Sequence, residues 1–175
     1  FGIAVADFNG DGIEDAALAQ NFFPTDRETV RYDGGRGLLL LGRGDGTFLA
    51  ETPHRSGIRV DGEGRGAAAA DFDRDGRVDL VIGQNGAATR LFRNRNGTPG
   101  IRVRVVGPRN NPDGIGSVLR AVFADGRFGP AREIHAGFGY WSQNGAVQVL
   151  APLEDIRAVD VRWPGGRVTR HVIPA

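Results

Sequence analysis

Residues 7–15 read Asp-Phe-Asn-Gly-Asp-Gly-Ile-Glu-Asp, and residues 71–79 repeat the pattern as Asp-Phe-Asp-Arg-Asp-Gly-Arg-Val-Asp. Both stretches place oxygen-bearing side chains at positions 1, 3, 5 and 9 and a glycine at position 6. Ca²⁺ takes about six to eight oxygen ligands from a flexible loop, and this spacing supplies side-chain oxygens plus the carbonyl of Ile13 or Arg77 at position 7. Carboxylates packed this closely repel one another without a cation. The doubled pattern therefore predicts two calcium loops.

The residues around the two loops distinguish them from EF-hand loops. An EF-hand needs a bidentate glutamate at position 12 and a helix on either side, whereas position 12 here is Leu18 in the first copy and Ile82 in the second. Short apolar runs bounded by Gly and Asn surround both loops, at residues 2–6, 16–21, 66–70 and 80–85. Runs of this kind favour buried β-strands.

The two copies define an internal repeat, because the match extends through the Gln-Asn pair that follows each loop. A long period with several strands in each unit is typical of a propeller or another stacked β array. In the first unit, residues 37–49 predict a hairpin that turns at the Gly-Asp-Gly of residues 44–46. The second unit has a shorter counterpart at residues 89–94, with a predicted turn at the Asn-Gly of residues 96–97. Asp-Gly and Asn-Gly both favour tight hairpins.

The loops, their β flanks and the Gly-Asp-Gly-Thr-Phe of residues 44–48 resemble FG-GAP/VCBS repeats. These repeats are the calcium-loop blades of integrin α-subunit propellers and of many secreted bacterial proteins. The resemblance spans residues 1–97 and implies four-stranded blades around an axis. It also implies that eight side chains are metal ligands: Asp7, Asn9, Asp11, Asp15, Asp71, Asp73, Asp75 and Asp79.

The sequence departs from a complete propeller in the number of its repeats. A closed propeller needs about four to eight blades, and two are recognisable here. The chain also begins without Met, inside what looks like the first strand of a blade. We therefore expect a fragment or a processed piece of a longer protein.

The character of the chain changes near residue 98. Six segments between Gly-, Pro- and Asn-rich turns predict short strands, at residues 101–106, 118–123, 132–135, 147–150, 158–163 and 168–173. Six short strands in this length favour a small β-sandwich or barrel. The predicted fold class is all-β, with two propeller-type blades in residues 1–97 and a small β domain in residues 98–175.

Four stretches of the second half carry a further likeness: Asn-Pro-Asp-Gly-Ile-Gly-Ser-Val at residues 111–118, Arg-Glu-Ile at 132–134, Gly-Phe-Gly-Tyr-Trp-Ser-Gln at 137–143 and Val-Arg-Trp-Pro-Gly-Gly at 161–166. They resemble the ASPIC/UnbV domain, which follows such repeats in cartilage acidic protein-like proteins. The family usually has His-Phe-Gly-Leu-Gly after the Ser-Gln pair, and residues 146–152 stand in its place here. The order of the two parts is the order that the resemblance implies.

Composition excludes several classes of site. The 175 residues contain no cysteine, which excludes disulfides and thiolate metal sites. No apolar run approaches the roughly 18 residues that cross a membrane.

The two halves differ in charge. Residues 1–89 carry 9 Arg against 15 Asp and Glu, whereas residues 90–175 carry 13 Arg against 6 Asp and Glu. Arg102 and Arg104 of the basic half lie on one predicted strand, and we interpret such arginines as a solvated face and expect no nucleic-acid partner.

Catalytic patterns are weak, so we expect no enzyme. His54, His135 and His171 are scattered without metal-ligand spacing, and no nucleophile elbow is present.

The expected function is that of a calcium-binding interaction or scaffold protein with two Ca²⁺ ions. We expect it outside the cytoplasm, in the extracellular space or the periplasm, with a protein partner in a larger assembly. Two alternatives stay open: an adhesion or carbohydrate-binding module that contacts polysaccharide, and a non-catalytic part of a larger enzyme.

Overall fold

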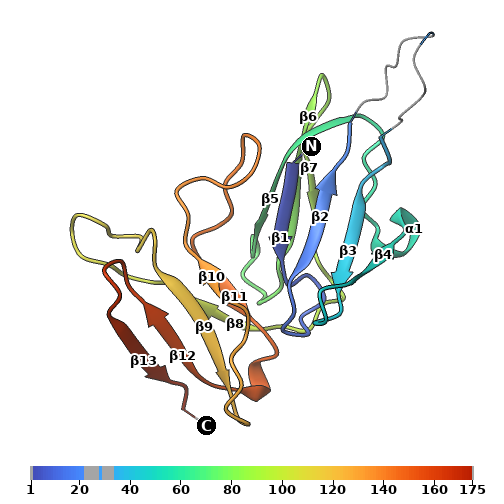
Figure 1. Ribbon diagram of the computed structural model, residues 1–175. Helices are drawn as coiled ribbons and strands as arrows, with labels where there is room; N and C mark the ends of the chain where they lie inside the picture. Colours follow the sequence, from blue (N-terminus) through green and yellow to red (C-terminus); the bar gives the residue numbers. More distant parts are fainter. Residues whose placement is uncertain (1, 22–27, 29–33, 175) are drawn as a thin grey trace.

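The computed structural model describes residues 2–21, 28 and 34–174. Thirteen antiparallel β-strands account for nearly all the regular structure of this part, beside the short helix α1 (Pro53–Ser56) and a 3-10 turn at Leu153–Asp155 (Figure 1). The predicted all-β fold class is confirmed. None of the helical segments in the described ranges is long and apolar enough to cross a membrane.

The first sheet is a four-stranded antiparallel meander in the order β1-β2-β3-β4. Its strands are β1 (Gly2–Ala6), β2 (Asp15–Ala19), β3 (Leu38–Gly42) and β4 (Phe48–Glu51). Ala4 pairs with Ala17, and Ala17 pairs with Leu39, so these three side chains share one face of the sheet. The first repeat therefore has the four strands that its resemblance to a propeller blade implied. Part of the polar stretch between β2 and β3 lies outside the described residues.

The second sheet has three strands in the order β5-β6-β7. They are β5 (Glu63–Ala70), β6 (Asp79–Asn85) and β7 (Arg90–Phe92). The expectation of four strands per blade is wrong for this repeat within the described residues. Its Asn-Gly dipeptide turns no hairpin, because the Gly97 N–H donates to Asn94 Oδ1 at 3.0 Å and the chain continues toward the C-terminal strands.

The two sheets pack face to face through small residues on their first strands. Ala4 of β1 and Ala67 of β5 are 0% and 1% exposed, and they share a hydrophobic cluster with Leu80 and Ile82 of β6. A methyl group at Gly2 would lie 2.3 Å from the carbonyl oxygen of Arg65. This close approach explains why Ala and Gly dominate β1 and β5, which lie side by side in Figure 1.

The C-terminal half contains all six predicted strands, several of them shorter than expected. They are β8 (Ile101–Val103), β9 (Val118–Phe123), β10 (Arg132–Glu133), β11 (Gln148–Leu150), β12 (Ile156–Arg162) and β13 (Val168–Val172). One sheet has the order β10-β9-β12-β13, and β8 pairs with β11 in a second. Both sheets contribute to one cluster that includes Leu119, Val159 and Leu150. The boundary at residue 97 stays a prediction.

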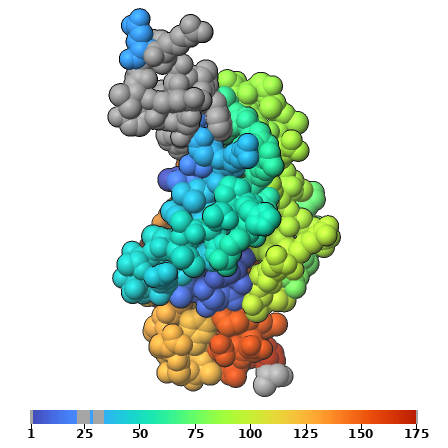
Figure 2. All heavy atoms as spheres, turned by 90° about the vertical axis from the view of Figure 1, so that its right-hand side faces the viewer, coloured from blue at the N-terminus to red at the C-terminus, as the bar shows by residue number. Residues whose placement is uncertain are grey.

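A short connecting segment, residues 97–100, joins the two halves and crosses both Asp-rich loops. The Thr98 N–H donates to the carbonyl oxygen of Asn9 at 2.8 Å, and the Gly100 N–H donates to that of Gly76, also at 2.8 Å. Figure 2 shows the N-terminal residues, in dark blue, lying against the orange and red C-terminal strands. The loop end of the blades is therefore the end on which the C-terminal half packs.

Candidate metal centre

Each Asp-rich loop joins the first two strands of its sheet, and position 9 is the first residue of the second strand. Four loop carboxylates are nearly inaccessible to water: exposure is 3% for Asp7, 0% for Asp15, 9% for Asp71 and 2% for Asp79. Burying a carboxylate costs free energy unless hydrogen bonds or opposite charges compensate it. The loops must therefore supply partners to all four.

In both loops the position-1 carboxylate accepts the amides of positions 5 and 6, and Asp7 also accepts the Gly10 N–H at 2.7 Å. One oxygen of Asp7 accepts the position-5 N–H at 3.1 Å, and the other accepts the position-6 N–H at 2.9 Å. The corresponding distances for Asp71 are 3.0 and 3.1 Å. Position 6 is Gly12 or Gly76, with φ of 85° and 83°, a left-handed conformation that favours glycine. The two copies thus fold in the same way.

The position-3 side chain converges on the same position-5 amide. Oδ1 of Asn9 accepts this N–H at 3.0 Å in the first loop, and Oδ1 of Asp73 accepts it at 3.3 Å in the second. Because Oδ1 of position 1 accepts the same N–H, the two Oδ1 atoms converge inside each loop. We call them the inner oxygens, and we call Oδ2 of position 1, which accepts the position-6 N–H, the outer oxygen.

The position-9 carboxylate ties the loop to the third strand of its sheet. Asp15 accepts the N–H of position 2 at 2.8 Å and the N–H of Gly42, at the end of β3, at 2.9 Å. Asp79 accepts the N–H of position 2 at 2.8 Å and that of Asn94, just after β7, also at 2.8 Å. An aspartate at position 9 therefore serves both as a candidate ligand and as a strand connector.

In the second loop, carboxylate oxygens of Asp71, Asp73 and Asp79 all lie within 4.8 Å of one another. These three residues could hold a metal ion. A donor set made only of carboxylate oxygens suits a hard cation such as Ca²⁺. Asp75 lies outside this group and forms an ion pair of 3.1 Å with Arg77. The proposed ligation by the carbonyl of Arg77 stays a prediction.

In the first loop, position 3 is the neutral Asn9, so positions 1, 3, 5 and 9 carry three carboxylates there and four in the second loop. The Asn9 amide nitrogen donates to Asp11 Oδ2 at 2.8 Å, which orients the inner oxygen of Asn9 toward the position-5 N–H. Asp7 directly follows β1, and Asp15 is the first residue of β2. Ligation by these side chains and by the carbonyl of Ile13 stays a prediction.

Burial raises the pKa of two carboxylates of the first loop, Asp7 and Asp15. For Asp7 the pKa rises from 3.8 to about 6, because desolvation outweighs the opposing hydrogen bond from Gly12 and the charge of Arg132. For Asp15 desolvation also raises the pKa, against hydrogen bonds from the Gly42, Phe8 and Asn9 amides. The hydrogen bonds of the loop therefore do not fully offset the cost of holding these charges away from water.

Two arginines of the C-terminal half contact the position-1 aspartates. Arg102 of β8 places its Nε 2.7 Å from the outer oxygen of Asp71. Arg132 of β10 places Nη2 3.8 Å from the outer oxygen of Asp7 and Nε 2.6 Å from Glu14. The interpretation of Arg102 as part of a solvated strand face is wrong, because its guanidinium points into the loop.

A third arginine contacts the second loop from within the blade. Arg93 follows β7 and forms ion pairs with Oδ2 of Asp73 and, at 3.7 Å, with Oδ2 of Asp75. Its side chain is 56% exposed. In the first sheet, the residue that corresponds to Arg93 is Leu41, because each precedes the residue whose N–H donates to position 9. Leu41 carries no charge, so it cannot make this contact with the first loop. The second loop is thus the more heavily compensated of the two.

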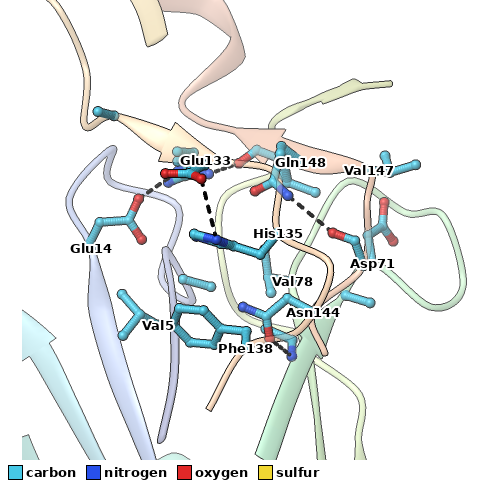
Figure 3. Close-up of a pocket in the computed structure, with 17 residues that line it drawn as sticks. Val5, Glu14, Asp71, Val78, Glu133, His135, Phe138, Asn144, Val147 and Gln148 are labelled. Carbon is cyan, nitrogen blue, oxygen red and sulfur yellow. Dashed lines mark hydrogen bonds and ion pairs between the residues drawn. The ribbon is translucent and has the colours of Figure 1, made fainter. Parts of the chain in front are cut away.

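A cavity of about 230 Å³ lies between the blades and the C-terminal half. Figure 3 shows residues of both halves around it, including Glu14 and Asp71 from the loops and His135 and Phe138 from the C-terminal half. His135 Nδ1 lies 3.7 Å from a carboxylate oxygen of Glu133. The other two histidines lie elsewhere, on α1 and β13.

The sequence predicted the loops but not their arginine partners. The spacing inside residues 7–15 and 71–79 is local and can be read directly, whereas Arg102 and Arg132 reach the loops only through the packing of the two halves. The one sequence signal that points toward these contacts is the charge asymmetry, with an acidic first half and a basic second half.

Comparison of the sequence with known proteins finds a repeat family in the region of both Asp-rich loops. Residues 7–82 match the model of the FG-GAP-like repeat. Cartilage acidic protein 1 of Xenopus tropicalis is 36% identical over 93 residues, and that of Homo sapiens is 33% identical over 100 residues. Each alignment covers 52% of this chain and 14% of the relative, so the chain spans only a small part of those proteins. The chain therefore carries an FG-GAP-like repeat and is partially similar to cartilage acidic protein 1.

Proposed function

We propose that each loop binds one Ca²⁺ ion and that the chain is a calcium-stabilised interaction module that works outside the cytoplasm. The observation that carries the proposal is the gathering of Asp71, Asp73 and Asp79 within 4.8 Å, in a loop whose backbone scheme the first loop repeats. Extracellular fluids hold enough calcium to fill sites of modest affinity.

The ion would stabilise the fold through the carboxylates that it neutralises. Asp7 and Asp15 in the first loop, like Asp71 and Asp79 in the second, follow one strand and begin the next. An ion bound between them would link the two strands and offset the cost of their burial. Because the unfolded chain has no such site, the free energy of binding adds to the free energy of folding.

We propose a binding role rather than a catalytic one. The buried loop carboxylates are engaged by backbone N–H groups, which holds them as ligands rather than as proton donors or nucleophiles. The partner is proposed to be a protein in an extracellular or periplasmic assembly.

Calcium titration of the full chain by isothermal calorimetry, with native mass spectrometry for the count, tests the metal sites. We expect two ions per chain, and one in Asp73→Ala. Asp45→Ala is the matched control, because Asp45 lies exposed in a Gly-Asp-Gly turn and bonds only Thr47. A wild-type chain that binds no calcium in the millimolar range contradicts the proposal.

A second candidate, carbohydrate binding, rests on an exposed aromatic pair. Trp141 is 90% exposed and stacks on Tyr140 with ring centroids 5.9 Å apart. Trp141 also has a φ of 50°, which is uncommon for a residue with a side chain. The Phe138 N–H donates to the Ser142 carbonyl oxygen at 2.9 Å and closes the turn that presents the pair. A glycan array probed with wild-type and Trp141→Ala protein tests this candidate.

A further inference from the structure

The C-terminal half contacts both candidate calcium loops at the same chemical group. In each loop, an arginine of the C-terminal half forms an ion pair with the outer oxygen of the position-1 aspartate. Arg132 pairs with Asp7 in the first loop, and Arg102 pairs with Asp71 in the second. The carboxylates are buried, with 1% and 0% of the side chain exposed. Removing one partner of a buried ion pair leaves an uncompensated charge, so neither contact resembles an ordinary surface salt bridge.

Backbone contacts bring the same two loops against the C-terminal half. A methyl group at Gly12, position 6 of the first loop, would lie 3.0 Å from the carbonyl oxygen of Ala151. A methyl group at Gly76, position 6 of the second loop, would lie 2.9 Å from the carbonyl oxygen of Gly100, the last residue of the connecting segment before β8. The loop conformation and the seating of the C-terminal strands are therefore geometrically dependent on one another.

The arginines contact a different oxygen of the position-1 aspartate from the one that converges with position 3. The inner oxygens of positions 1 and 3 converge on the position-5 amide, whereas the arginines contact the outer oxygen, which accepts the position-6 amide. Cation and guanidinium can thus use different oxygens of one carboxylate. In the first loop, residues 7–15 carry four carboxylates, so a Ca²⁺ ion leaves a net negative charge that still attracts Arg132.

We propose that Arg102 and Arg132 are positioning residues for the two calcium loops, so that calcium binding and docking of the C-terminal strands strengthen each other. The inference rests on the proposed calcium function. Each arginine fixes the rotamer of the position-1 carboxylate and keeps its inner oxygen directed into the loop. Partners of metal ligands act in this way in many sites, and their loss weakens binding. The coupling is reciprocal, because each event must favour the other by the same factor.

Arg93 provides a contrast within the same loop. Its guanidinium contacts Asp73, a member of the group of three aspartates, together with Asp75. It follows β7, and its ion pairs among the described residues stay within the second loop. We expect Arg93 to compete with the ion, so its removal changes calcium affinity in the direction opposite to the removal of Arg102.

The first test is calcium titration of the full chain carrying Arg102→Gln. We expect affinity at one of the two sites to fall about tenfold. Arg104→Gln is the matched control, because Arg104 lies two residues away and pairs at 3.9 Å with the exposed Asp113, not with a loop. Arg93→Gln is expected to raise affinity at the same site. Arg102→Lys, which keeps the charge but loses the guanidinium geometry, is expected to lose less affinity than Arg102→Gln.

The second test measures docking by hydrogen–deuterium exchange in the same proteins. The Ala69 N–H donates to the Asn144 side chain, and the Gly145 N–H donates to the Ala69 carbonyl oxygen, both at 2.9 Å across the junction of the two halves. We expect calcium to slow exchange at both amides in wild-type and Arg104→Gln protein. In Arg102→Gln protein the effect of calcium is expected to shrink.

The outcomes separate the inference from the proposed function. If the wild-type chain binds no calcium, the proposed function fails and the inference fails with it. If calcium binds at two sites but Arg102→Gln leaves affinity unchanged or raises it, the calcium function stands and the inference is overturned. Should Arg102→Gln fail to fold, Arg102→Lys decides: weaker calcium binding supports the inference, and unchanged or tighter binding overturns it.

Discussion

The two Asp-rich loops share a backbone but differ in how their charge is compensated. In the second loop, three of the four aspartates have an arginine partner: Asp71 with Arg102, Asp73 with Arg93 and Asp75 with Arg77. In the first loop, Arg132 is the one arginine with a described ion pair, and it divides its contacts between Asp7 and Glu14. A repeated motif can thus keep its hydrogen-bond scheme while its electrostatics diverge.

Under the proposed calcium function, we expect the first loop to depend more on a bound cation than the second. Its carboxylates lie away from water with raised pKa values, so charge there is costly without an added positive ion. The second loop has a carboxylate at each of positions 1, 3, 5 and 9 but already has arginines against three of them. The three predictions below use this contrast.

The largest effect is expected for the position-9 aspartates. Asp15 accepts N–H groups of Phe8, Asn9 and Gly42, whereas Asp79 accepts two. Each buried N–H left without a partner costs about 1–3 kcal/mol. We expect Asp15→Ala to lower the free energy of unfolding by about 3–5 kcal/mol in chelator, and Asp79→Ala by less, as measured by urea denaturation.

Asp45→Ala is the control for this series, since its carboxylate is exposed. A larger loss for Asp79→Ala than for Asp15→Ala contradicts the ranking of the two loops.

A smaller, calcium-dependent effect is expected at position 3. Asp73→Ala removes a candidate ligand that accepts one weak 3.3 Å hydrogen bond and pairs with Arg93, whose side chain is 56% exposed, so the pair itself contributes little. At a calcium concentration of about 100 times the dissociation constant, losing that site costs about 2.7 kcal/mol. We expect a lower melting temperature in millimolar calcium and almost no change in chelator. Asn9→Ala, in the first loop, is expected to cost less, because an amide is a weaker ligand than a carboxylate.

Scanning calorimetry in calcium and in chelator measures the two melting temperatures. If Asp73→Ala lowers the melting temperature equally in both buffers, the second loop has no metal role.

The last effect is expected from pH, at Asp7. The pKa of Asp7 is about 6 in the folded chain against 3.8 for the ordinary side chain, so the folded state binds this proton more tightly than the unfolded state. Its contribution to stability is therefore complete below about pH 3.8 and is lost as pH rises through about 6. In chelator, we expect wild-type stability to fall relative to Asp7→Asn by up to about 3 kcal/mol across this window.

In calcium we expect the opposite trend, with wild-type stability rising with pH relative to Asp7→Asn. A carboxylate must lose its proton to bind the ion, so calcium affinity rises with pH. Urea denaturation of both proteins between pH 4 and pH 7 checks the prediction. Parallel curves for wild type and Asp7→Asn in chelator would show that Asp7 does not titrate in this window.

The strands and loops could be predicted because their signals are local. The Gly and Asn residues that bound the apolar runs placed β1, β2, β5 and β6 to within a few residues, and the loop spacing identified Asp71, Asp73 and Asp79. The six C-terminal strands were also predicted. Their ends differ because tertiary packing, not local propensity, sets where pairing stops: β8 ends at Val103 although the alternating pattern continues.

Two features could not be predicted from local pattern. The Asn-Gly of residues 96–97 has the composition of a hairpin turn, but the Asn94 side chain captures the Gly97 N–H and directs the chain across the loops. The contacts of Arg102 and Arg132 join residues far apart in sequence. Only the packing of the two halves determines which arginines meet aspartates.

The connecting segment also has a mechanical consequence. A pull that separates the C-terminal strands from the blades acts first on residues 97–100, where Thr98 is bonded to Asn9 and Gly100 to Gly76. Both hydrogen bonds end on the Asp-rich loops, so tension between the halves is transmitted into them. The resistance of the junction to force should therefore rise and fall with the rigidity of these two loops.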